Sequence, residues 1–231
     1  MTFDAPGLAP PIKAAAEPAR DCPLCPRLVA YRAANRAAHP DWFNGPAPSF
    51  GEASARLLVV GLAPGRAGAN RTGRPFTGDF AGVLLYETLL KTGFARGRYL
   101  ARPDDGLELV DCMITNAVRC APPGNKPEGS EEATCRRFLA ARLADLPQLK
   151  VIVTLGDVSR RNVLRALGLK ANAVPGGHGA ESEVGAYRLI NSYHCSRLNT
   201  NTGRLTATMF EDVFQRARSL LDSRTPPSIR P

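Results

Sequence analysis

The chain has 231 residues, of which 44% are hydrophobic, so it is long enough for one domain with its own core. Its 30 Lys and Arg residues exceed its 21 Asp and Glu residues, and the formal net charge is +9. This excess favours a polyanionic partner such as nucleic acid, although a merely basic surface would carry the same charge. No apolar run reaches membrane-spanning length, and the Ala- and Pro-rich N-terminus contains Asp4 but no continuous apolar segment. We therefore expect a cytoplasmic protein without a secretory signal or a membrane partner.

The ends of the chain differ in composition from its middle. Residues 1–18 are predicted to be a flexible lead-in, and residues 224–231 a C-terminal tail. No linker or internal repeat divides the segment between them, so we expect residues 19–223 to form a single domain.

Short apolar runs alternate with helical patterns along this domain. Four runs predict buried strands: 56–64, 109–118, 150–156 and 186–194. Helical patterns cover 80–93, 130–146, 157–168 and 203–221, with starts predicted at Ser130 and Asp157. This alternation predicts an α/β fold, a three-layer αβα sandwich around a central, mostly parallel four-stranded sheet. Ligands of such sheets bind at the carboxyl ends of the strands, where "GLAPGRAGAN", "TNAVRC" and "SYHCS" should converge.

The chain has six cysteines, and in a reducing compartment they indicate metal binding or free thiols rather than disulfides. Four of them have a spacing that suits zinc or an iron–sulfur cluster, with ordinary buried thiols as the alternative: Cys22, Cys25, Cys120 and Cys135. Cys112 lies within an apolar strand and is expected in the core. Cys195 follows His194, and adjacent residues of an extended chain point to opposite faces, so we do not expect a Cys–His dyad.

Residues 61–82, "GLAPGRAGANRTGRPFTGDFAG", form a loop between a strand and a helix. Its six glycines allow close approach to a ligand, but it matches neither the P-loop nor the GxGxxG pattern. Arg66, Arg71 and Arg74 are candidates for phosphate contacts, or are simply solvated.

Three further residues, in a loop, before a helix and at the end of a strand, have both a functional and a structural interpretation. Phe76 could stack on a planar base or fill the core. Asp79 precedes a helix, where it could orient a water molecule or cap the helix. Asn116 ends a strand, where its amide could pair with a base edge or simply belong to a turn.

Together these motifs resemble the uracil-DNA glycosylase superfamily, and in particular its family 5, or type B, branch. The resemblance extends from "CPLCPRLVAYR" through "GLAPGRAGANRTGRPFTGD", "TNAVRCAPPGNKP" and "GHGAE" to "SYHCSRLNTNTGRLT". It implies the uracil-DNA glycosylase fold and a DNA repair enzyme that flips uracil out of DNA and hydrolyses its N-glycosidic bond. Such a reaction needs no more than one copy of the chain, so we expect a monomer. The abasic site would be left uncut, and hypoxanthine or other deaminated bases could also be substrates.

The resemblance also assigns roles to particular residues. It implies catalytic roles for Asp79, His194 and Asn116, with Asp79 positioning water and His194 donating to uracil O2. It implies a base pocket formed by Gly61, Ala63, Phe76, Asn116 and His194. It implies a [4Fe–4S] cluster held by Cys22, Cys25, Cys120 and Cys135. In the motif that contains His194, Leu198 is the candidate wedge and Arg197 and Arg204 are candidate phosphate ligands, alongside Arg66, Arg71 and Arg74.

The sequence departs from related branches at two places. Leu62 and Ala63 stand where other branches carry acidic or polar residues, and neither can activate water. Cys195 follows His194 where Pro is common, and the basic insertion of the DNA-crosslinking branch is missing before this histidine. The first departure motivates an alternative function: a non-catalytic protein of the same fold that binds uracil or abasic DNA. A second alternative is a redox-active iron–sulfur protein that also binds DNA.

Overall fold

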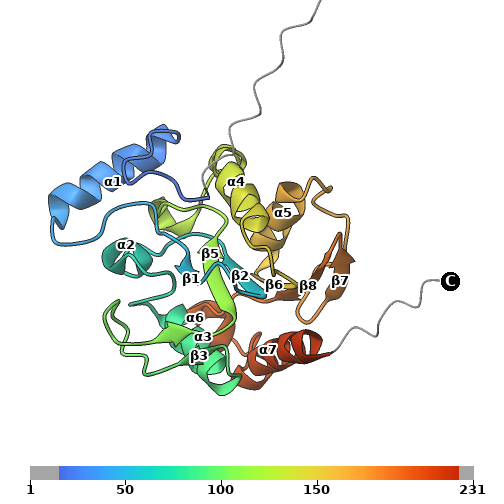
Figure 1. Cartoon of the computed structure of the whole chain (residues 1–231). Coiled ribbons are helices and arrows are strands. Elements are labelled where there is room, and N and C mark those ends of the chain that lie inside the picture. Colours follow the sequence, from blue (N-terminus) through green and yellow to red (C-terminus); the bar gives the residue numbers. More distant parts are fainter. Residues whose placement is uncertain (1–15, 224–231) are drawn as a thin grey trace, which may run out of the picture.

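The computed structural model describes residues 16–223, so the predicted tail (224–231) and most of the predicted lead-in (1–18) lie outside the described residues. A six-stranded sheet has helices on both faces (Figure 1). The strand order is β1-β5-β2-β6-β8-β7. The four inner strands are parallel: β5 (Cys112–Asn116), β2 (Leu57–Gly61), β6 (Val151–Leu155) and β8 (Tyr187–Ser192). They confirm the mostly parallel four-stranded centre that the apolar runs predict.

Two antiparallel strands extend this centre at its edges. β1 (Phe50–Gly51) pairs with β5, and β7 (Glu181–Val184) pairs with β8. The sequence does not reveal them, because one has two residues and the other carries two glutamates at partly or fully exposed positions. A separate two-stranded ladder joins β3 (Ala95–Arg96) and β4 (Glu108–Leu109).

The alternation of side chains along the inner strands produces two cores. Leu57 and Val59 pack with α3 (Phe80–Lys91) and α7 (Ala207–Asp222), which cover one face of the sheet. Leu58 and Val60 pack with α4 (Gly129–Ala144) and α5 (Asp157–Ala166) on the other face. Strands β2, β5 and β6 are buried along their whole length, as expected for a parallel sheet covered on both sides.

The helix ends follow local capping chemistry. α4 begins at Gly129, with Glu128 and Glu131 forming a capping box, rather than at Ser130. α7 begins after Thr206, whose side chain accepts a hydrogen bond from Met209 N. The remaining helices are α1 (Pro26–Ala38), α2 (Ala69–Thr72), the 3-10 turn η1 (Pro123–Asn125) and α6 (Arg197–Asn201).

α1 was not predicted from the sequence. Its buried side chains are Leu28, Arg32 and Asn35, so its inward face is largely polar and gives no apolar periodicity. Glu17, which the prediction assigns to the lead-in, forms ion pairs with the buried Arg119 and with Arg142. None of the helices in the described range 16–223 has the length and hydrophobicity needed to cross a membrane.

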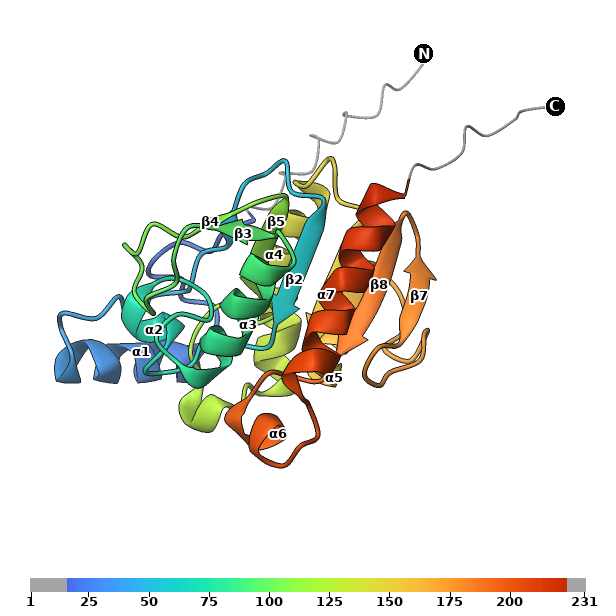
Figure 2. The ribbon, with the colours of Figure 1, turned by 90° about the horizontal axis from the view of Figure 1, so that it is seen from below.

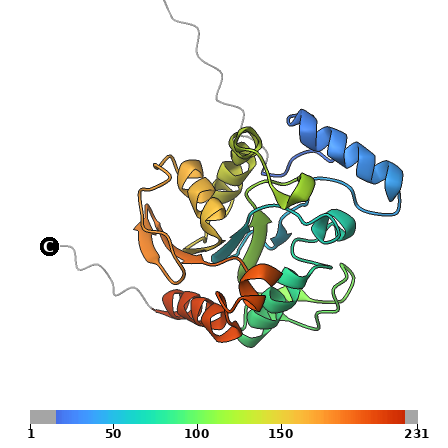
Figure 3. The same ribbon diagram turned by 180° about the vertical axis from the view of Figure 1, so that it is seen from behind.

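The parallel strands direct several loops to one end of the molecule. The arrowheads of β2 and β8 point toward the end at which α6 lies (Figure 2). Seen from behind, α6 stands in front of the sheet beside α3 (Figure 3). The loops that follow β2, β5 and β8 therefore meet where an open α/β sheet binds its ligands.

Candidate active site

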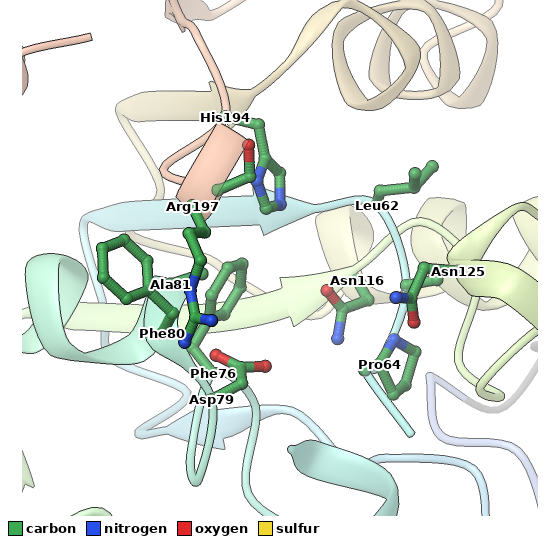
Figure 4. Close-up of a pocket in the computed structure, with 13 residues that line it drawn as sticks. Leu62, Pro64, Phe76, Asp79, Phe80, Ala81, Asn116, Asn125, His194 and Arg197 are labelled. Carbon is green, nitrogen blue, oxygen red and sulfur yellow. The ribbon is translucent and has the colours of Figure 1, made fainter. Parts of the chain in front are cut away.

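A cavity of about 410 Å³ lies at this end of the sheet. It is lined by Leu62, Ala63, Pro64, Gly65, Phe76, Asp79, Phe80, Ala81, Asn116, Asn125, His194, Ser196 and Arg197. In Figure 4, Asp79, Phe76 and Arg197 lie on one side, Asn116 and Asn125 on the other, and His194 above. The structure thus brings together the four side chains to which the resemblance assigns stacking, base recognition and catalysis: Phe76, Asp79, Asn116 and His194.

Phe76 forms a wall of the cavity and has an unusual backbone conformation. Its φ is +52°, a left-handed value that costs a residue with a side chain about 1–2 kcal/mol. The residue is 7% exposed, and the centre of its ring lies 6.1 Å from the centre of the His194 ring. A Cβ added at Gly61 would lie 2.6 Å from Phe76 Cζ and 2.5 Å from Asn116 Oδ1. Gly61 is therefore needed for the ring and the amide to approach the end of β2.

Asn116 is the last residue of β5 and presents a buried amide to the cavity. The residue is only 2% exposed. Its Oδ1 is one of the buried side-chain oxygen and nitrogen atoms for which the described part of the chain supplies no hydrogen-bond partner. A buried polar atom without a partner is costly in the free protein, so an unpaired acceptor facing a cavity indicates a ligand that donates to it.

Asp79 combines the two roles that its sequence position suggests. It is the N-cap of α3, and its Oδ1 accepts a hydrogen bond of 3.0 Å from Gly82 N. Its Oδ2 faces the glycine-rich loop, since a Cβ added at Gly68 would lie 2.3 Å from this atom. Burial raises the pKa of Asp79, and the N–H groups of Gly82 and Ala81 only partly oppose this shift. The capping bond uses one oxygen, and the other remains available at the cavity.

His194 lies just beyond the end of β8. Burial lowers the pKa of its imidazole, so the neutral form is favoured at neutral pH. Asn199 Nδ2 donates to its carbonyl oxygen at 2.8 Å, which ties the backbone of His194 to α6. His178, to which the sequence analysis gave no role, supports the same segment: Tyr193 N donates to its Nδ1 at 3.2 Å. His178 Nε2 then donates to Met209 O at 3.1 Å.

The candidate DNA-contacting residues differ in their surroundings. Arg197 lines the cavity, with Cζ 5.1 Å from the centre of the Phe80 ring. Leu198, next to it on α6, is 73% exposed. The Arg204 guanidinium lies over the Tyr193 ring, with its Cζ 4.5 Å from the ring centre. Arg71 is exposed, and Arg66 is anchored to α1 by a 2.8 Å bond from its Nε to Asn35 Oδ1.

Arg74 is a correction to the predicted set of phosphate contacts. It is 5% exposed, and its two terminal nitrogens each donate to a carboxylate oxygen of Asp105 at 2.8 Å. Its Nε donates to Thr77 Oγ1 at 2.7 Å. Because the side chain is buried and each of its three nitrogens already donates inside the protein, Arg74 is not available to a DNA phosphate.

Asn125 is a cavity residue that the sequence analysis missed. It lies in the turn between Cys120 and α4, with a left-handed φ of +57° that asparagine tolerates better than most residues. Its motif, "PPGNKP", is part of the family resemblance, but only the fold shows that this turn reaches the cavity.

The four spaced cysteines converge elsewhere, between α1 and α4. Cys22, Cys25, Cys120 and Cys135 line one small apolar pocket together with Leu28 and Phe138. Burial raises the pKa of Cys120 to about 11 and that of Cys135 to about 12. Among the described residues, no group of three or more His, Cys, Asp or Glu side chains is arranged to hold a metal ion.

The other two cysteines lie in the hydrophobic core. Cys112 is 1% exposed, as predicted for a residue within a buried strand. Cys195 is fully buried in the same cluster of apolar side chains. It therefore turns away from the cavity that His194 lines, in agreement with the prediction that these two neighbours form no dyad.

The fold and the cavity define a class of protein, and sequence comparison identifies it. The model of the uracil DNA glycosylase superfamily matches residues 48–218, which include all six strands of the main sheet. The chain belongs to this superfamily. It is similar to the Type-5 uracil-DNA glycosylase of Thermus thermophilus, with 45% identity over 206 residues that cover 86% of this chain and 93% of the relative.

Further relatives agree with this placement. The Type-5 uracil-DNA glycosylase of Mycobacterium tuberculosis is 42% identical over 209 residues, which cover 86% of this chain and 78% of the relative. The Type-4 uracil-DNA glycosylase of Thermotoga maritima is 31% identical over 173 residues, 74% of this chain and 80% of the relative. The similarity to the Type-5 relatives is thus both higher and longer than the similarity to this Type-4 relative.

Proposed function

We propose that this protein is a monofunctional DNA glycosylase that excises uracil from DNA by hydrolysis of the N-glycosidic bond. The observation that carries the proposal is one cavity that a stacking ring, an amide oxygen without a partner, a half-buried carboxylate and a neutral imidazole line together. Relatives with 39–45% identity that are named Type-5 uracil-DNA glycosylase support it. Monomeric state and cytoplasmic location stay predictions.

Base recognition follows from the chemistry of two side chains. An extruded uracil would stack on the Phe76 ring, which forms a wall of the cavity. Asn116 Oδ1 would accept from uracil N3–H, and Asn116 Nδ2 would donate to O4, so the amide reads one edge of the base. Cytosine presents the opposite pattern of donor and acceptor at these positions and would leave the amide unsatisfied.

Bond cleavage would use the other two side chains. As the C1′–N1 bond breaks, its electron pair goes to the base and the sugar acquires oxocarbenium character. His194 would donate a hydrogen bond to O2 of the departing uracil anion. Asp79 Oδ2 would orient a water molecule and take its proton when the oxygen attacks C1′. No lysine lines the cavity, so a Schiff base and strand cleavage are not expected of it.

The proposal is tested by base release from a labelled duplex with a single uracil. We expect alkali-sensitive cleavage at the uracil position, and none before alkali, because hydrolysis leaves an intact abasic strand. A duplex with hypoxanthine at the same position measures whether the activity extends to other deaminated bases. Tight binding of the uracil duplex without base release would instead support the non-catalytic DNA-binding protein that the apolar Leu62 and Ala63 suggest.

DNA contacts are proposed for the exposed side chains around the cavity. Arg197 and Arg204 would meet phosphates near α6, and Arg66 and Arg71 would do so from the exposed part of the glycine-rich segment that follows β2. Leu198 would enter the stack that the uracil vacates, because it is a strongly exposed apolar side chain beside the cavity.

Leu198→Ala should slow uracil release from duplex DNA by roughly 10-fold, because the vacated stack is no longer filled. Release from single-stranded DNA should be nearly unchanged, since no duplex stack needs filling there. Single-turnover rates on both substrates measure this difference. Leu169→Ala removes a side chain that is 38% exposed, away from the cavity, and serves as the matched control. Equal losses on both substrates would show that Leu198 is not a wedge.

A [4Fe–4S] cluster is proposed for the pocket lined by Cys22, Cys25, Cys120 and Cys135. The fit is supported by two N–H groups directed at the sulfurs: Arg119 N lies 3.3 Å from Cys135 Sγ, and Arg32 Nη1 lies 3.7 Å from Cys120 Sγ. Such donors stabilise thiolates, which the raised pKa values would otherwise disfavour. The cluster would join α1 to the turn that carries Asn125 and to α4, and no catalytic step would depend on it.

Cys135→Ser should abolish the brown colour and most of the bound iron and acid-labile sulfide. Because cluster binding contributes to folding, we expect Tm to fall by roughly 5–10 °C. Iron and sulfide analysis of anaerobically purified protein, together with thermal unfolding, measures both effects. Cys112→Ala changes a buried cysteine outside the pocket and should retain the iron. Wild-type protein that lacks iron and sulfide after anaerobic purification would reject the cluster.

A further inference from the structure

A buried polar group lies behind the Phe76 wall and has no part in the proposed chemistry. Its centre is the bidentate ion pair between Arg74 and Asp105, at 2.8 Å for each of the two bonds. Asp105 also accepts from Leu100 N at 2.9 Å and from Leu107 N at 3.1 Å. The ion pair therefore ties the 100–107 segment to the loop that carries Phe76.

Two tyrosines complete this group. The rings of Tyr86 and Tyr99 stack at 4.6 Å, and the Arg74 guanidinium lies 5.3 Å and 5.8 Å from their respective centres. Tyr86 Oη donates to Pro75 O at 2.6 Å, and Tyr99 Oη donates to Phe76 O at 3.2 Å. The two hydroxyls thus donate to the carbonyl oxygens of the peptide bonds that precede and follow Phe76.

These bonds converge on the residue with the left-handed backbone. At φ +52°, Phe76 occupies a conformation that persists only where its surroundings determine it fully. Thr77, the next residue, is bound as well: its Oγ1 accepts from Arg74 Nε at 2.7 Å and donates to Pro75 O at 3.2 Å. The strained segment is thus held by side chains from α3, from the 99–105 region and from Arg74 of its own loop.

The same packing reaches Asp79 through Gly82. A Cβ at Gly82 would lie 1.7 Å from Phe76 O and 2.7 Å from Tyr99 Oη, so only glycine lets these atoms meet. The N–H of this glycine is the group that Asp79 Oδ1 caps, at 3.0 Å. The position of the stacking ring and that of the carboxylate are therefore set at one point of α3.

We propose that Arg74, Tyr86, Tyr99 and Asp105 form a Phe76 clamp, a set of positioning residues that holds the stacking ring preformed for the extruded base. The inference rests on the proposed function, because it names how that site receives its base. A ring fixed before binding loses no conformational freedom when the base arrives, so the clamp contributes to capture of the base. The arginine that the sequence suggests for DNA thus acts inside the protein.

A double-mutant cycle tests the clamp. Tyr99→Phe removes the hydroxyl that binds Phe76 O and keeps the stacked ring. We expect single-turnover uracil release to slow by roughly 2- to 10-fold, the worth of one hydrogen bond. In a Phe76→Ala background, the same substitution should have no further effect, because the ring that the hydroxyl positions is missing. Tyr187→Phe is the matched control, since the Tyr187 hydroxyl makes no hydrogen bond within residues 16–223.

Affinity gives a second measurement that needs no turnover. A duplex with 2′-fluoro-2′-deoxyuridine resists cleavage, because the fluorine disfavours the oxocarbenium-like sugar, and its Kd reports base capture. Tyr99→Phe should raise this Kd and leave the Kd for an undamaged duplex unchanged. Equal losses in both Phe76 backgrounds, or no loss from Tyr99→Phe, would overturn the clamp. A wild-type protein that binds the fluorinated duplex tightly but releases no uracil would reject the glycosylase, while the cycle could still be read in Kd.

Discussion

Asp79→Asn is expected to lower the single-turnover rate of uracil release by roughly 10²- to 10⁴-fold, the usual contribution of a general base. The substitution separates the two roles of this side chain. Asparagine is as good an N-cap as aspartate, so its amide oxygen can still accept from Gly82 N and α3 should form normally. Only the ability to take a proton from water is removed. Thermal unfolding measured beside the rate verifies that the cap is kept.

The pH dependence gives the same residue a second test. Burial raises the pKa of Asp79, and the base must be ionised, so activity should be lost on acidification at a higher pH than an exposed aspartate would require. This acid limb should vanish from the residual activity of Asp79→Asn. Asp157→Asn changes an aspartate that is 48% exposed at the start of α5, and should keep both the rate and the limb. A normal rate for Asp79→Asn would remove Asp79 from the mechanism.

The fold could be predicted where burial alone decides it. The four inner strands of the sheet are read from the sequence because a strand covered on both faces must be apolar throughout. α1 could not be read in this way. Its buried face includes Arg32 and Asn35, whose burial is stabilised by groups distant in sequence, such as Cys120 Sγ. The pattern of apolar residues carries no information about such partners.

The candidate site could be predicted in part, for a related reason. Asp79, Phe76 and Asn116 follow or end the predicted strands, and the topology of a parallel sheet brings such residues to one edge. Each of them also has a structural interpretation, as a core residue, a helix cap or a turn residue, and only the family resemblance favours the functional one. Arg74 shows what this reasoning misses. In the sequence, Arg74 and Arg71 are both arginines of the same glycine-rich loop, but Arg74 is buried in an ion pair with Asp105, 31 residues later. Asn125 and His178 likewise reach the site through contacts between distant segments.

His194→Ala is expected to slow uracil release by roughly 10²- to 10³-fold, the loss measured when one preorganised donor to a developing anion is removed. The donor is effective because it is fixed: His178 holds the backbone of Tyr193, and Asn199 holds the carbonyl of His194 itself. Burial lowers the pKa of His194, so the imidazole is neutral at working pH and donates without having to be protonated. The rate of the wild-type protein should therefore be flat from about pH 7 to pH 9.

Two comparisons decide whether His194 acts on the leaving base. His194→Gln retains an N–H donor and should recover part of the rate, whereas His194→Ala should not. Duplexes with 5-fluorouracil, a better leaving group, should reduce the effect of His194→Ala, because less charge then needs stabilisation in the transition state. If both substrates lose the same factor, the histidine serves binding rather than departure of the base. In that case Asp79, through attack by water and stabilisation of the sugar cation, would carry the larger part of catalysis.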